Sequence, residues 1–464
     1  MKVNKIWYLG IYPDVRNSKL NYRDHYLKHG IGEDRIPSPF LFSNSGSLNY
    51  KFSSCLYILL LLNGLSLNSQ LMFRYLRRII CFLQYRQLKL FNIDTLVISP
   101  WLGGGVFESF KIYNEKLYTS KNLLLLRGIA NTNKITETPM ILTAFHFGVT
   151  KFSFLLFFPS EVINQLSQKI DNLPVHINHF FDLTFNFHQL LKNNSLKLVL
   201  FIHDYNLFSK FPHLYNEKLL IRLRLEDACK YFPNIDIDTE TVISRINLFI
   251  LPSKSVQHNL NILIPKSKQL VLYPPEETNI ESSHVKRIES KDTFKILILG
   301  HLGNYKGLNL VSDVINLSHK MKAPYSFYHI GNEIKNMPVN IYANFSNVNR
   351  KEITGLISEL EVDFAWLPFQ CEETYSFTLS DIFRSHLPLI STNLGAIPER
   401  CLGRERTILL DPDLDARAIL VAFQNFINFK EDNLLAGLSL HPTLNPEDLM
   451  ILRKRDISTY QLLF

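Results

Sequence analysis

The sequence has few cysteines and no long apolar run. Its 464 residues include five cysteines, an odd number without the C-x-x-C spacing of a zinc site. No stretch approaches the roughly 20 apolar residues of a membrane-spanning helix, and the N-terminus lacks the pattern of a secretory signal. These absences argue against a disulfide-stapled scaffold and a spanning helix, and they predict a reducing, cytoplasmic location.

The composition is that of a folded globular chain. Hydrophobic residues make up 46% of the sequence, and charged residues make up 20%. At roughly 100–200 residues per domain, the length predicts two or three domains.

The positive charge is concentrated near the N-terminus. The net charge is +8, but residues 1–92 alone carry thirteen Lys and Arg against four acids, a net of +9, so the remainder sums to −1. A nucleic-acid-binding protein would spread basic and aromatic side chains over its binding face. The sequence therefore predicts no nucleic-acid partner.

A basic amphipathic helix is expected within residues 51–92. The apolar run Leu56–Leu62 comes first, and no acid occurs between Lys51 and Asp94. Apolar side chains then recur at helical spacing, and basic side chains lie between them. The apolar residues are Met72, Leu76, Ile79, Ile80 and Leu83, and the basic residues are Arg74, Arg77, Arg78, Arg86 and Lys89. Such a helix either packs on the protein body with a solvated basic face or lies on an anionic membrane.

After residue 93, short apolar runs alternate with helical patterns, which is typical of an α/β fold. The expected strands of the first series are Thr95–Ile98, Ile141–Phe145, Val175–Ile177, Lys197–Ile202 and Leu248–Leu251. Those of the second series are Phe294–Leu299, Ser326–Ile330, Phe364–Trp366, Leu389–Ser391 and Thr407–Leu410. We therefore expect two Rossmann-like domains facing a cleft, after a small helical region.

The expected boundaries follow from composition. A polar stretch without an apolar run separates the two strand series. The predicted parts are a helical module (1–45), an apolar and basic helical segment (46–92), a first Rossmann-like domain (93–275), a linker (276–292) and a second Rossmann-like domain (293–464).

Two glycine-rich turns follow expected strands. Gly103, Gly104 and Gly105 precede a helical pattern at 107–117, and Gly300-His301-Leu302-Gly303-Asn304-Tyr305-Lys306-Gly307 precedes another helix. Glycines let backbone N–H groups approach an anion at a helix N-terminus, and Lys306 adds a positive charge suited to phosphate. An ordinary strand-to-helix turn is the alternative for each, and the second is not a Walker motif.

A third turn carries two acids. Glu373 lies in the turn and Asp381 on the helix that follows, so both can face a ligand at that helix N-terminus. A further glycine turn, 393–400, follows the next strand. The two turns together outline one pocket.

The ordered motifs resemble those of retaining glycosyltransferases of the GT-B fold, group-1/family-4 type, that build bacterial O-antigen and other surface polysaccharides. The likeness covers residues 93–415: the glycine turns at 103–105 and 300–307, the stretches 175–179 and 201–205, the Pro-Ser strand end at 249–253, and the E-x7-E-like region from Glu373, with Asp381 where the family has Glu. Many relatives also have an Arg where His301 stands here.

The resemblance implies a role for each matching residue. Glu373, His203 and Lys306 would be catalytic, with Lys306 also holding the donor diphosphate and His203 contacting the sugar. The other donor-binding residues would be Gly103, Gly104, Gly105, Gly303, His301, Ser376, Phe377, Thr378 and Asp381, the last on the ribose. His176, His179, Asp204 and Tyr205 would lie on the acceptor side, although histidines at strand ends are also commonly structural. No metal or other cofactor is expected.

The N-terminus is similar to a short helical module of bacterial surface-polysaccharide transferases. Residues 7–15, 25–30 and 35–39 carry a YL…PDV…HYL…R-x-P pattern. The resemblance implies a transferase that moves a sugar from a nucleotide sugar to a glycan or lipid-linked glycan, with retention, at the inner face of the cytoplasmic membrane. The alternatives are a catalytically weak or inactive protein that binds glycans or partners in an assembly complex, and a sugar phosphorylase of the same fold.

Overall fold

The computed structural model describes eleven stretches of the chain and five isolated positions. The stretches are 21–25, 93–99, 122–128, 140–146, 149–156, 174–179, 196–234, 239–274, 285–332, 340–344 and 350–428, and the single positions are Lys5, Val15, Leu27, Ser109 and Ile334. The expected N-terminal module lies almost wholly outside them, apart from the short helix α3 (Tyr22–His25). The basic segment and the turn at Gly103, Gly104 and Gly105 also lie outside the described residues.

The first sheet has eight strands in the order β10-β9-β6-β5-β1-β2-β3-β4. Their bounds are β1 Thr95–Ser99, β2 Asn122–Gly128, β3 Met140–His146, β4 Val149–Leu156, β5 Pro174–Ile177, β6 Lys197–Phe201, β9 Leu248–Leu251 and β10 Gln269–Val271. The strands from β9 to β2 pair in parallel. The helix α10 (Thr239–Arg245) precedes β9.

The expected strand Ile141–Phe145 exists as β3, and it is not one of the parallel strands. β3 runs antiparallel to both β2 and β4. Two residues separate β3 from β4, and so short a connection can join only antiparallel strands. The carboxyl end of β3 therefore lies at the edge of the sheet opposite to that of β2.

The second sheet has six strands, all parallel, in the order β13-β12-β11-β14-β15-β16. Their bounds are β11 Phe294–Gly300, β12 Tyr325–Gly331, β13 Asn340–Asn344, β14 Phe364–Leu367, β15 Leu389–Thr392 and β16 Thr407–Leu410. Numbered from β11, this order is 3-2-1-4-5-6, that of the doubly wound Rossmann sheet. The prediction of two Rossmann-like α/β domains is thus confirmed.

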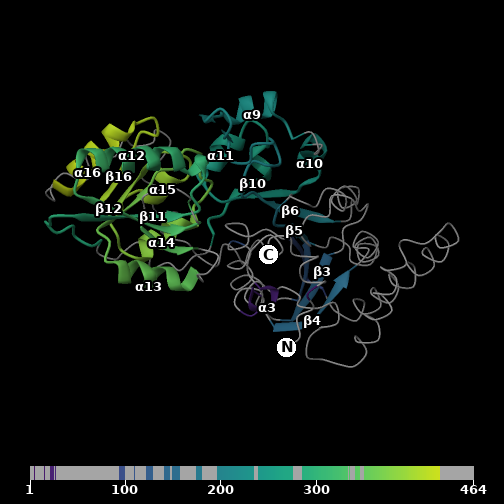
Figure 1. Ribbon diagram of the computed structural model, residues 1–464. Helices are drawn as coiled ribbons and strands as arrows, with labels where there is room; N and C mark the ends of the chain where they lie inside the picture. Colours follow the sequence, from purple (N-terminus) through teal and green to yellow (C-terminus); the bar gives the residue numbers. More distant parts are fainter. Residues whose placement is uncertain are drawn as a thin grey trace, which may run out of the picture. The chain divides into compact units, whose positions relative to one another are not determined.

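Helices cover both faces of the second sheet (Figure 1). α12 (Leu308–Met321) and α16 (Ala416–Asn428) pack with Ile296 and Ile298 of β11 on one face. α13 (Arg350–Leu360) and α14 (Phe377–Arg384) pack with Leu297 and Leu299 on the other. Because neighbouring side chains of β11 enter different cores, the strand is a continuous apolar run, as buried parallel strands are.

The chain divides into two compact units. One holds the described residues up to 202 together with 239–250, and the other holds 203–234 and 251–428. The second unit therefore includes a segment that follows β6 in the chain, with the hairpin β7 (Tyr215–Asn216) and β8 (Ile221–Arg222) and the helix α9 (Leu225–Tyr231). It also includes α11 (Lys254–Leu260). None of the helices described is both long and apolar enough to cross a membrane.

Candidate active site

The strand order fixes where a ligand of the second unit should bind. β11 and β14 are neighbours in the sheet, yet the chain leaves β11 toward β12 on one side and β14 toward β15 on the other. In doubly wound sheets, ligands bind outside the carboxyl ends of the strands at this switch point. The turns that follow β11, β14 and β15 are the three turns of this unit that the sequence singled out.

The turn after β11 packs against the segment after β14. Gly307 has a φ of +90°, and a Cβ added there would lie 2.2 Å from the carbonyl oxygen of Pro368. The backbone N–H of Gln370 donates to the carbonyl oxygen of Tyr305 at 3.0 Å. At Gly300, where φ is +111°, an added Cβ would lie 3.2 Å from the Thr378 hydroxyl oxygen. These close approaches require glycine and bring the two motifs together.

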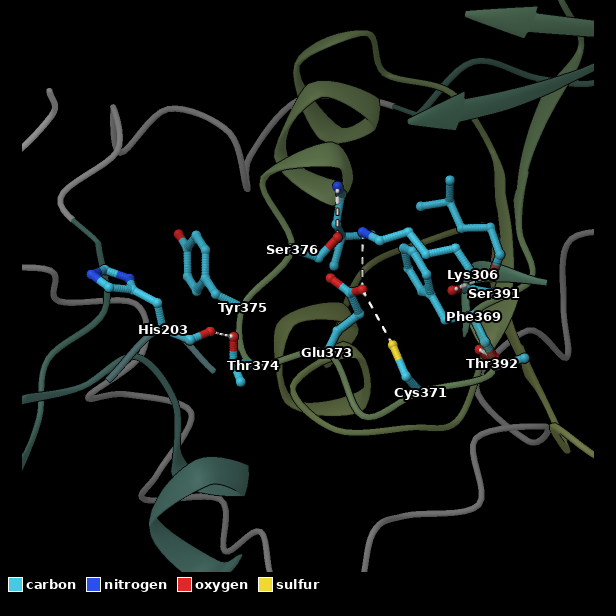
Figure 2. Close-up of polar contacts among 12 residues, drawn as sticks. His203, Lys306, Phe369, Cys371, Glu373, Thr374, Tyr375, Ser376, Ser391 and Thr392 are labelled. Atoms are coloured by element: carbon cyan, nitrogen blue, oxygen red, sulfur yellow. Dashed lines mark hydrogen bonds and ion pairs between the residues drawn. The ribbon is translucent and has the colours of Figure 1, made fainter. Parts of the chain in front are cut away.

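Lys306 and Glu373 form the central ion pair of the site (Figure 2). The Lys306 Nζ lies 3.0 Å from the Glu373 Oε1, and the two side chains are 20% and 11% exposed. Lys306 is held by the short helix η5 (Asn304–Lys306), and its Nζ lies 5.2 Å from the centre of the Phe369 ring. Burial opposes the charge on Lys306, but the Glu373 carboxylate, together with Cys371 and Tyr305, outweighs it and raises the Lys306 pKa.

Two further contacts hold Glu373. The thiol of Cys371 donates to the Glu373 Oε1 at 3.7 Å, and burial together with the carboxylate keeps the Cys371 pKa well above its ordinary value. The Glu373 carbonyl oxygen accepts a hydrogen bond from the Ala396 N–H at 2.7 Å. Gly395, with a φ of +56°, allows this approach, since a Cβ there would lie 2.4 Å from the same oxygen.

The N-terminus of α14 lies beside this pair. Ser376 is the N-cap residue, with a φ of 69°, and its hydroxyl accepts a hydrogen bond from the Leu379 N–H at 3.4 Å. Phe377 and Thr378 form the first turn of the helix, whose backbone N–H groups carry partial positive charge. A lysine next to a helix N-terminus makes a site suited to a phosphate group.

Arg400 fixes the loop that leads into α14. Its Nη1 donates to the carbonyl oxygens of Tyr375 and Ser376, at 2.9 and 2.5 Å, and its Nη2 donates to the Ser380 hydroxyl at 2.8 Å. The guanidinium also lies 3.9 Å from the centre of the Tyr375 ring. Arg400 is buried in α15 (Ile397–Cys401), so it joins the glycine turn after β15 to the start of α14.

Asp381 is buried within α14 and forms an ion pair there. Its Oδ1 lies 2.7 Å from the Arg384 Nη1, one helical turn away. The side chain of Asp381 is 8% exposed. Contact with a ribose stays a prediction, and it would require this carboxylate to serve two partners.

His203 reaches the Glu373 loop through its backbone. The Thr374 hydroxyl donates to the His203 carbonyl oxygen at 2.6 Å. Figure 2 shows the His203 imidazole pointing away from the Lys306–Glu373 pair. In the following residues, Asp204 accepts a hydrogen bond from the Asn206 N–H at 2.9 Å and Tyr205 is buried.

The remaining predicted residues lie at two places. In the second unit, Gly303 is the N-cap of η5, and His301 is exposed at the surface. Partial desolvation of the His301 ring and the charge of Lys306 lower its pKa. In the first unit, His176 and His179 are buried at the end of β5, and the His176 ring lies 6.0 Å from the Phe201 ring.

Sequence reasoning missed four residues of this site: Cys371, Arg400, Asn259 and His213. The His213 ring stacks on Tyr305, with centroids 4.4 Å apart and an interplanar angle of 8°. Desolvation lowers the His213 pKa, although Asp204 and Glu373 oppose the shift. Arg400 stands in the quoted glycine turn, but the other three carry no local pattern that could have identified them.

No group of three or more His, Cys, Asp or Glu side chains is arranged to hold a metal ion within the residues that the structure describes.

No known protein-family model matches the chain, and no curated protein sequence matches it either. Solved structures resemble it at low identity. HepE of Anabaena in complex with UDP and glucose is 11% identical, covers 80% of this chain and 98% of its own, and gives a TM-score of 0.47. Sucrose-phosphate synthase from Thermosynechococcus elongatus is 11% identical, with coverages of 80% and 95% and a TM-score of 0.46. The E. coli trehalose-6-phosphate structure bound with UDP-2-fluoro glucose is 11% identical, with coverages of 80% and 98% and a TM-score of 0.47.

Proposed function

We propose that the chain is a glycosyltransferase that uses a nucleotide-sugar donor. The observation that carries this proposal is the Lys306–Glu373 pair beside the N-terminus of α14, at the switch point of a Rossmann sheet. A departing nucleoside diphosphate develops negative charge, which a lysine and helix-terminal N–H groups stabilise without a metal. The carboxylate of Glu373 keeps Lys306 charged and directs its ammonium group.

We also propose the finer assignments that follow from the motif resemblance. The sugar is a hexose, the transfer proceeds with retention, and the acceptor is a growing surface glycan of the O-antigen or capsule type, free or lipid-linked. The basic segment 51–92 would hold the protein on the inner face of the cytoplasmic membrane. The net charge of +9 in residues 1–92 supports this membrane location, because each basic residue near an anionic surface contributes about 1 kcal/mol to the binding free energy.

The first experiment is a thermal shift of the purified protein with UDP, GDP, ADP and dTDP, with and without magnesium. A ligand that binds only the folded state raises the melting temperature by mass action. We expect one nucleotide to give a clear rise that Lys306→Ala abolishes and that the exposed control Lys320→Ala retains. The magnesium arms report whether binding needs the ion.

Transfer is then measured with the matching nucleotide sugar. We expect Lys306→Ala and Glu373→Gln each to lower turnover about a hundredfold or more, since each removes charge stabilisation of the leaving group. The exposed control Glu352→Gln should keep wild-type turnover. Wild-type rates in both site variants would overturn the assignment.

The Asp381–Arg384 pair supports a second candidate function. Because this carboxylate already has a cationic partner, the donor site can be one that binds without turning over. The chain would then be a glycan-binding or partner-binding component of a polysaccharide assembly complex. Nucleotide-sugar binding without transfer to any of several acceptors would favour this candidate over the enzyme.

A further inference from the structure

Three polar side chains meet next to the Glu373 loop: those of Tyr205, Asn259 and Glu372. Asn259 stands in the last turn of α11. Its amide Nδ2 donates both to the Tyr205 hydroxyl oxygen, at 2.9 Å, and to the Glu372 Oε2. One amide group therefore holds a phenol and a carboxylate that belong to distant parts of the chain.

The Tyr205 phenol and the Glu372 carboxylate require a neutral hydrogen-bond donor between them. Tyr205 is 1% exposed, and burial together with Glu372 raises its pKa, so it remains a phenol. An ionised carboxylate can only accept hydrogen bonds, whereas the amide of Asn259 supplies two donors. Aspartate has the same shape as asparagine but carries charge and has no donor when ionised.

The residues on both sides of Glu373 are each held by a hydrogen bond to another part of the chain. Glu372 is held by Asn259, and the Thr374 hydroxyl is held by the His203 carbonyl oxygen at 2.6 Å. The Glu373 carbonyl oxygen is held by the Ala396 N–H. With residues 372–374 each held by one of these hydrogen bonds, Glu373 directs its carboxylate at Lys306 and Cys371.

We propose that Asn259 is a positioning residue for the donor site. It binds the Glu372 carboxylate and thereby fixes the backbone from which Glu373 reaches Lys306. This inference rests on the proposed function, because the ion pair it positions is the proposed donor-diphosphate site.

The test is Asn259→Asp, which keeps the shape of the side chain and places two carboxylates in contact. Two charged carboxylates in contact repel each other, so the Glu372 segment must move. Misplacing a site by about 1 Å can cost about a hundredfold in rate. We expect a loss of about tenfold or more in kcat/KM for the donor, and in nucleotide affinity, relative to the wild type.

Two rescues distinguish positioning from a general loss of structure. At lower pH the two carboxylates share a proton, so the ratio of variant to wild-type activity should recover between pH 8 and pH 5.5. In the double variant Asn259→Asp/Glu372→Gln, the glutamine amide donates to the new carboxylate, and activity should recover at every pH. Cys371 and Glu399 also interact with Tyr205. Both residues are present in the wild type and in every variant, so their titration cancels in the ratio of variant activity to wild-type activity. A pH dependence of this ratio therefore reports the two carboxylates in contact.

The matched control is Asn261→Asp, an exposed residue just after the same helix. It introduces the same charge at the same end of α11 and should leave kcat/KM, nucleotide affinity and melting temperature as in the wild type. Wild-type kcat/KM in Asn259→Asp at pH 8 would overturn the proposal, and so would a double variant no more active than Asn259→Asp.

The melting temperature separates this proposal from the proposed function. Asn259→Asp should lower it at pH 8, and the added Glu372→Gln should restore it, whether or not the protein transfers sugar. If the wild type neither binds nucleotide nor transfers sugar, the proposed function fails while the melting temperatures still decide the hydrogen-bond network. If the wild type is an active enzyme but Glu372→Gln does not rescue Asn259→Asp, the positioning role of Asn259 fails and the proposed function stands.

Discussion

Glu399, on the glycine turn after β15, has a buried carboxyl group. It is 5% exposed, and its Oε2 accepts a hydrogen bond from the Lys254 N–H at 3.1 Å. Burial raises its pKa from 4.5 to about 7, although the N–H groups of Ser255 and Lys254 oppose the shift. The folded protein therefore holds this proton more tightly than the unfolded chain does.

The pH dependence of stability should reveal Glu399. Because the folded-state pKa is the higher one, the contribution of Glu399 is most favourable below pH 4.5 and is lost as pH rises through about 7. At about 1.4 kcal/mol per pKa unit, the loss is up to about 3 kcal/mol. Glu399→Gln carries no such proton, so its free energy of unfolding minus that of the wild type should rise from pH 5 to pH 8 in urea titrations. A difference that stays constant over this range would contradict the raised pKa.

A substitution at Gly395 also has a predictable effect on stability and nucleotide binding. Gly395→Ala places a methyl group 2.4 Å from the Glu373 carbonyl oxygen and puts an alanine at a φ of +56°. The left-handed backbone alone costs about 1–2 kcal/mol, and the clash displaces Glu373. We expect a lower melting temperature and a loss of the nucleotide-induced shift.

Gly355 provides the matched control for that substitution. It lies inside α13, and an added Cβ would meet nothing within 4 Å. Alanine is favoured over glycine in a helix by roughly 0.5–1 kcal/mol, so Gly355→Ala should raise the melting temperature and leave nucleotide binding unchanged. Equal effects of the two substitutions would show that Gly395 has no special role.

At the scale of elements, the start of α14 depends on Arg400. The guanidinium binds two carbonyl oxygens and one hydroxyl at once, a fork geometry that lysine lacks. Arg400→Lys should therefore destabilise the fold by about 1–3 kcal/mol and weaken nucleotide binding, measured by urea unfolding and by the thermal shift. The exposed Arg417→Lys on α16 is the control and should change neither. A wild-type nucleotide shift in Arg400→Lys would separate this arginine from the donor site.

Strands of both sheets could be predicted where their apolar runs are short and bounded by polar residues. The strands Leu248–Leu251 and Thr407–Leu410 have the predicted bounds. The direction of β3 could not be predicted from its apolar run, because antiparallel pairing depends on the two-residue connection to β4. β13 was not predicted, since its run Asn340–Asn344 is short and carries asparagine at both ends.

The candidate site was predicted only where its residues share a motif. Lys306 and Glu373 stand in glycine-rich or acidic turns after strands, so a local pattern marked them, and the sheet order brings them to 3.0 Å. Asn259 contacts Glu372 across 113 positions of the chain, and no local pattern records such a contact. Long-range positioning contacts of this kind can be found only once the fold is known.

At the scale of the whole molecule, the uneven charge predicts binding to anionic membranes. Residues 1–92 carry a net charge of +9 while the rest of the chain sums to −1, and the basic residues Arg74, Arg77 and Arg78 lie in the stretch that has no acid. This stretch lies outside the described residues, so the prediction rests on the sequence. We expect the protein to float with vesicles containing phosphatidylserine and to remain unbound with purely neutral vesicles.

Charge reversal tests the source of that binding. Each basic residue near an anionic surface contributes about 1 kcal/mol, so Arg74→Glu/Arg77→Glu/Arg78→Glu should abolish flotation with anionic vesicles. Salt should also weaken the wild-type binding, because the screening length falls from about 10 Å at 0.1 M to about 3 Å at 1 M. A matched triple reversal of exposed residues on the second unit, Lys230→Glu/Lys320→Glu/Arg417→Glu, produces the same net charge, and this variant should still float with anionic vesicles.

If both triple variants lose vesicle binding equally, net charge alone attracts the protein, and residues 51–92 form no membrane-binding face. If the apolar face Met72, Leu76 and Ile79 also inserts, replacing those residues by serine should release the protein even at low salt, because the electrostatic attraction that remains lacks the buried apolar area.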